Sequence, residues 1–77
     1  MLEVFNNAIS NNEYYICLYG SSLYVYNYQE ILSFHNELIR LKLPSKTLKI
    51  KGVNMLIKKM HQHELLIEGQ IVSASYE

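Results

Sequence analysis

Three histidines and one cysteine are the residues of this chain best suited to metal binding or covalent chemistry. His61 and His63 stand two residues apart, so an extended segment would direct both imidazoles to one side, and His35 is the third. Zinc needs three or four ligands, and neither Cys17 nor any carboxylate stands at a convincing spacing. Cys17 lies in an apolar run, which favours a small hydrophobic role over a nucleophile. No triad, phosphate-binding glycine loop or carboxylate pair can be assembled either, so we expect no enzymatic activity, metal or cofactor.

Positive charge is confined to one stretch of the chain. Seven basic and seven acidic residues give a formal net charge of zero, yet all seven basic residues fall between positions 40 and 59, where there is no acid. This segregation exceeds what solubility requires and favours a docking face for an acidic partner or anionic lipid head groups. The alternatives are a solvated outer face, or self-assembly of the positive face against the acidic edge of another copy.

Basic and apolar residues alternate within this stretch, at positions 39–43 and 48–51. Successive strand side chains point to opposite faces, so the apolar residues would line a core and the basic residues would face solvent. If the two segments form a hairpin, four basic residues share one surface. We call this predicted partner-binding surface the basic face: Arg40, Lys42, Lys49 and Lys51.

Six of the seven tyrosines fall between positions 14 and 28, within one predicted hairpin. Both faces of that hairpin would carry aromatic rings, so we expect part of this surface to contact a second copy or a membrane protein. The alternative is ordinary half-exposed strand tyrosine. Tyrosines and lysines occupy different segments, which disfavours nucleic-acid binding. The residues predicted to make this contact are Tyr14, Tyr19, Tyr24, Tyr26 and Tyr28.

From residue 13 onward, runs of β-branched and aromatic residues alternate with short turn signals. This sequence pattern predicts a single all-β domain over 13–77, with about eight short antiparallel strands in meander order, folded as a twisted sandwich or open barrel. Over 1–12, apolar residues at helical spacing predict a short helix or an arm. The strands are predicted at 13–19, 22–27, 30–35, 38–43, 47–51, 53–59, 64–68 and 70–76.

Three glycines mark predicted turns or bends. Gly20 begins a tight turn, and Gly52 stands where the apolar alternation changes from even to odd positions, which predicts a bulge or sharp bend. The pattern Leu-x-Ile-x-Gly occurs at 48–52 and again at 65–69, ending on Gly69. We expect two similar strand, glycine, strand units side by side.

Length and composition predict the oligomeric state and the cellular compartment of the protein. A chain of 77 residues buries only a marginal core, and 49% hydrophobic content is high for the surface of a solitary small domain, so we expect a homo-oligomer. A single cysteine favours a reducing, cytoplasmic compartment. No apolar run approaches the roughly 18 residues needed to cross a bilayer, so we expect any membrane contact to be peripheral.

From Tyr15 to the C-terminus, the ordered set of segments resembles the YabP/YqfC family of small sporulation proteins of endospore-forming Firmicutes, more closely its YqfC branch. The segments that carry the resemblance are Leu23-Tyr24-Val25-Tyr26-Asn27, Ile31 to Phe34, Glu37-Leu38-Ile39-Arg40, Leu48-Lys49-Ile50-Lys51-Gly52 and Glu64 to Ile71.

The resemblance implies a non-enzymatic structural or adaptor protein that is made in the mother cell for spore envelope formation. It implies action at the outer forespore membrane beside an integral membrane sporulation protein. The other function left open is a small basic-faced β module that binds anionic lipid or nucleic acid outside sporulation.

Overall fold

The computed structural model describes residues 8–10, as strand backbone, and 13–77. Seven strands form one sheet in which all neighbours are antiparallel, and the described residues include no helix, hence none that could cross a membrane. The strands are β1 (Ala8–Ser10), β2 (Tyr15–Tyr19), β3 (Ser22–Tyr26), β4 (Glu30–His35), β5 (Leu38–Leu43), β6 (Lys46–His61) and β7 (Glu64–Tyr76).

The all-β prediction is confirmed, with corrections to the strand count. The segments predicted at 47–51 and 53–59 form one strand, β6, because the bend between them does not interrupt its pairing with β7. The last two predicted segments likewise merge into β7. Ala8–Ser10 is strand and not helix, because it pairs with β2; the rest of the predicted N-terminal helix or arm lies outside the described residues.

The predicted meander order is wrong. Along the sheet the strands follow the order β1-β2-β3-β7-β6-β5-β4, so β3 is next to β7 and not next to β4. The physical reason is the length of β6 and β7, with 16 and 13 residues. Each is long enough to pair with different neighbours in its two halves: β3 pairs with Glu64–Glu68, and β5 pairs with Lys46–Lys51.

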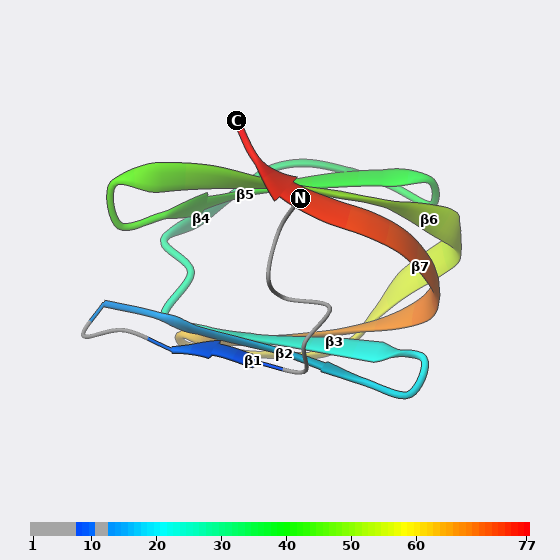
Figure 1. Ribbon diagram of the computed structural model, residues 1–77, viewed down its shortest axis with the longest axis horizontal. Coiled ribbons are helices and arrows are strands. Elements are labelled where there is room, and N and C mark those ends of the chain that lie inside the picture. Colours follow the sequence, from blue (N-terminus) through cyan, green and yellow to red (C-terminus); the bar gives the residue numbers. More distant parts are fainter. Residues whose placement is uncertain (1–7, 11–12) are drawn as a thin grey trace.

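The sheet folds over itself into two facing layers (Figure 1). In that view β1, β2 and β3 lie in a lower layer, β4 and β5 lie in an upper layer, and β6 and β7 curve from one to the other. Apolar side chains of both layers fill the space between them. Among the residues whose side chains are described, ten are fully buried: Ile16, Leu23, Val25, Leu65 and Ile67 from the lower layer, and Ile39, Leu41, Leu43, Leu48 and Ile50 from the upper layer.

Two of the predicted glycine bends lie where β6 and β7 curve. The pairing of the two strands shifts register between Lys51 and Gly52. A Cβ atom on Gly52 would collide with the backbone oxygen of Gln70, and one on Gly69 would lie 2.8 Å from the Asn54 carbonyl oxygen. Gly69 also has a φ of +148°, which side-chain-bearing residues rarely adopt. The two Leu-x-Ile-x-Gly units therefore run antiparallel, each leading from a buried segment into this bend.

Candidate functional site

The four residues of the basic face do share one surface, the outer face of the upper layer. Arg40 on β5 stands directly opposite Lys49 on β6, while Lys42 faces Thr47 and Lys51 faces Leu38 in the same register. The alternate residues of both strands are fully buried, so the basic side chains point outward. The sequence alternation alone predicted this placement correctly.

Part of the positive charge on this face is neutralised. Arg40 donates two hydrogen bonds to the Glu77 carboxylate, with Nε and Nη2 at 2.9 and 2.6 Å from its oxygens. This hydrogen bonding lowers the pKa of Glu77 below its ordinary value, aided by the positive charges of Arg40 and Lys49. Glu30 on β4 stands opposite Lys42. Lys42, Lys49 and Lys51 make no ion pair within the part of the chain that the structure describes, so these three cations stay available to a partner.

Four tyrosines lie together on the outer face of the lower layer. Tyr15 stands opposite Tyr26, and alternation places Tyr19 and Tyr24 on the same side, away from the buried residues of the hairpin. The rings of Tyr15 and Tyr24 pack edge to face, with centroids 6.2 Å apart. Tyr19 is 79% exposed and Tyr26 is 47% exposed. We call Tyr15, Tyr19, Tyr24 and Tyr26 the tyrosine face.

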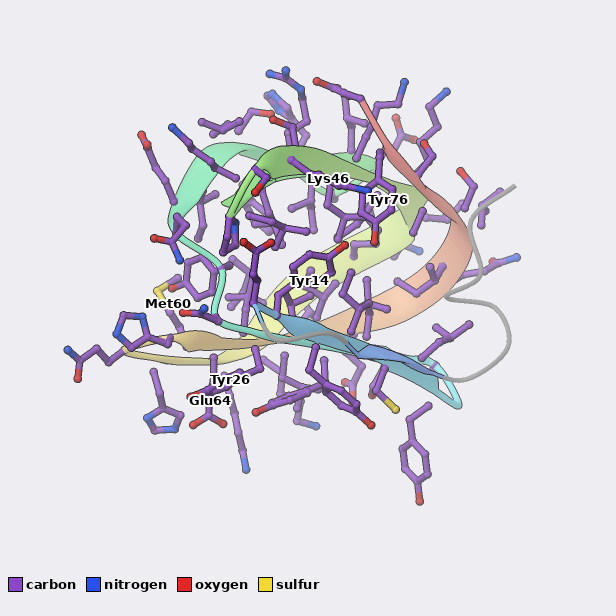
Figure 2. All side chains as sticks on the ribbon, turned by 60° about the vertical axis from the view of Figure 1, so that its left-hand side comes forward. Tyr14, Tyr26, Lys46, Met60, Glu64 and Tyr76 are labelled. Atoms are coloured by element: carbon purple, nitrogen blue, oxygen red, sulfur yellow. The ribbon has the colours of Figure 1, made fainter. Side chains whose placement is uncertain are left out.

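Tyr14 and Tyr28, predicted to belong to the same contact surface, lie elsewhere. Tyr14 is only 4% exposed, and its hydroxyl group forms a hydrogen bond with that of Tyr76 between the layers (Figure 2). Lys46 Nζ lies 4.3 Å from the centroid of the Tyr76 ring. Tyr28, in the link between β3 and β4, packs against the core. Tyr14 precedes Tyr15 by one position, so strict alternation already separates the two.

A cleft on the tyrosine face was not predicted from the sequence. It has a volume of about 270 Å³ and is lined by Tyr24 from β3, by Glu64, Leu65 and Leu66 from β7, and by Lys59 and His61 from β6. The Tyr24 hydroxyl group donates a 2.9 Å hydrogen bond to Glu64 Oε1. Burial and this bond to a carboxylate raise the pKa of Tyr24 to about 12. Only the pairing of β3 with β7 brings these residues together, and local patterns give no signal for it.

The remaining charged and chemically reactive residues are dispersed. His35, His61 and His63 are exposed, and the described ranges hold no group of three residues that could bind a metal ion. Lys58 forms a 3.4 Å ion pair with Glu68. Lys58 and Lys59, although part of the basic stretch, lie beyond the bend and away from the basic face.

The two candidate surfaces are therefore on opposite sides of the molecule. The basic face is the outer surface of the upper layer, and the tyrosine face is the outer surface of the lower layer, with the core between them. In Figure 2, Tyr26 and Glu64 point away from the core on the lower side, while Tyr14 and Tyr76 lie between the layers. One flat partner cannot contact both faces of the same copy.

Comparison with known proteins places the chain in a family. A model of the YabP family matches residues 11–77. No curated protein and no solved structure matches the chain. The match does not distinguish the YqfC branch, which stays a prediction. Because only the first ten residues fall outside the match, the chain belongs to the YabP family.

Proposed function

We propose that the protein is a non-enzymatic adaptor that lies on the mother-cell side of the outer forespore membrane, with its basic face toward the anionic lipid surface. Membership of the YabP family indicates a sporulation-related protein, and the proposal adds where and how it acts. It also assigns the opposite surface, the tyrosine face, to protein contacts.

The observation behind the proposal is the basic face itself. Its cations lie on adjacent strands of one sheet, with small side chains from β7 beside them: Ser75 pairs with Lys49 and Ser73 pairs with Lys51. A face of this kind presents its cations to a flat partner without steric obstruction. Each Lys or Arg close to an anionic membrane surface contributes about 1 kcal/mol to binding.

Vesicle co-sedimentation tests this role. Wild-type protein should bind vesicles that contain phosphatidylglycerol, should not bind phosphatidylcholine vesicles, and should lose binding steeply as salt is raised. The double substitution Lys49→Glu/Lys51→Glu should weaken binding more than about tenfold, because it removes two attractions and adds two repulsions.

The chain offers a matched control for this experiment. Lys58→Glu/Lys59→Glu makes the same change of charge on the other side of the bend, and it should leave most of the binding intact. Equal losses for the two double variants would show that total charge and not the basic face is responsible. Tight binding to single-stranded nucleic acid with no affinity for vesicles would favour the alternative function.

A further inference from the structure

The tyrosine face combines a projecting aromatic side chain with a cleft, at opposite ends of one surface. Tyr19 is the most exposed of the large hydrophobic residues among those described, at 79%. It lies beside the β2–β3 turn, where it stands opposite Ser22 on β3, and Ser22 in turn stands opposite Glu68 on β7. The cleft lies around Glu64, the first residue of β7, next to the β6–β7 turn.

We propose that the protein forms a two-fold symmetric dimer through the tyrosine face, in which Tyr19 of each copy inserts into the cleft of the other. This inference rests on the proposed function only in taking the tyrosine face as the protein-binding side, and it names the partner: a second copy of this chain. A two-fold axis in the plane of the interface, perpendicular to the line from Tyr19 to the cleft, exchanges the two ends of the tyrosine face. Each copy therefore supplies one tyrosine and one cleft.

The lining of the cleft suits a phenol ring. The Leu66 side chain offers an apolar wall. Lys59, which has no ion pair within the described ranges, can lie over an incoming ring. A carboxylate accepts several hydrogen bonds, so Glu64 can accept one from Tyr19 of the other copy in addition to the one from Tyr24. The cleft has room for one side chain, with a volume of about 270 Å³.

Charge also distinguishes the two faces as surfaces for self-association. Around the tyrosine face, Glu64 and Glu68 are balanced by Lys58 and Lys59, and one of these pairs is a formed ion pair. Two such faces meet without net repulsion. Two basic faces would repel each other, because the cations of the basic face outnumber Glu30 and Glu77.

The size of the face is sufficient for a dimer. The molecule measures 30 × 25 × 21 Å, and the layers are seen edge-on in Figure 1, so each outer face covers about 30 by 21 Å. Complete contact between two such faces would bury at most about 1,260 Å² in total, at the lower end of the 1,200–2,000 Å² typical of specific interfaces, so nearly the whole face must take part in the dimer. The tyrosines would supply the aromatic anchors that dominate such interfaces.

Sedimentation equilibrium in the absence of lipid tests the proposal. Wild-type protein should approach twice the 9.0 kDa mass of one chain as its concentration rises. Tyr19→Ser should weaken the dimer by at least about tenfold, and Tyr19→Phe should retain most of it. Val72→Ser, which changes an exposed apolar residue at the bend of β7, should have little effect. A wild type that stays monomeric, or equal losses for Tyr19→Ser and Val72→Ser, would overturn the proposal.

Disulfide trapping tests the specific geometry. In a Cys17→Ser background that keeps Tyr19, Ser22→Cys combined with His61→Cys should form covalent dimers faster than either single cysteine variant, because Ser22 stands opposite Tyr19. Within one copy the two positions are about four residues apart along the strands, or about 13 Å, too far for an internal disulfide. Equal trapping rates would show that Tyr19 does not enter the cleft. Vesicle binding, measured separately, reports on the basic face and not on the dimer.

Discussion

The two outer faces of this small sheet are built by the same alternation of strand side chains but differ in what they expose. The upper layer presents cations of which, among the described residues, only Arg40 has a formed ion pair, to Glu77. The lower layer presents aromatic rings and balanced charges. The core between them separates the surfaces, so one molecule has two separate candidate contact surfaces. An adaptor needs two such sides, and a bend in two long strands is enough to create them.

Removing that bend is expected to have the largest effect, because both faces depend on it. Gly69→Ala forces a side chain into a φ of +148° and against the backbone of Asn54 and Met55, so the free energy of unfolding should fall by about 3 kcal/mol. Urea denaturation measures it. Gly20→Ala, at a turn where the added atom meets nothing, should cost less, about 1 kcal/mol. Equal losses would mean that the bend is not specially constrained.

Coupling between the two faces gives the next largest effect. A dimer joined through the tyrosine faces directs its two basic faces in opposite directions, so wild-type protein should cluster phosphatidylglycerol vesicles. Tyr19→Ser should reduce the rate of clustering by about tenfold or more while single-vesicle binding falls much less. Turbidity and co-sedimentation, measured on the same samples, separate the two quantities. Unchanged clustering by this variant would show that the faces are not coupled through a dimer.

The basic face can be strengthened as well as weakened. Glu77→Gln removes the carboxylate that pairs with Arg40, so the face gains one net positive charge. Affinity for anionic vesicles should rise about fivefold, corresponding to about 1 kcal/mol. Glu68→Gln makes the same change on the lower layer and should have little effect on vesicle binding. A decrease for Glu77→Gln would indicate that the ion pair organises the face instead of masking it.

The smallest expected effect is a pH dependence confined to the tyrosine face. Tyr24 has a pKa of about 12 in the folded protein against 10.0 for an ordinary tyrosine, because burial and the bond to Glu64 disfavour its ionised form. Its contribution to stability is therefore complete below pH 10 and is lost as pH rises toward 12. Denaturation of wild type and Tyr24→Phe across this range should show a steeper decline for the wild type. Parallel declines would contradict the assignment.

Several features could be predicted from single strands. The basic face needed only the alternation at 39–43 and 48–51, and the bend at Gly52 needed only the change in that alternation. The strand order and the cleft could not be predicted in this way. The order β3-β7-β6 depends on how far β6 and β7 continue past their glycines, and no local pattern specifies that length.

The sequence by itself determined which side of each strand is apolar, where the glycines allow a bend, and that the basic residues of β5 and β6 share a surface. Local sterics and side-chain alternation decide these features within a few residues. Only the tertiary structure decided that Tyr28 packs against the core, that Glu64 meets Tyr24 across 40 positions, and that the two candidate faces are opposed. These features depend on pairing between distant segments, which is settled by the burial of both apolar faces at once.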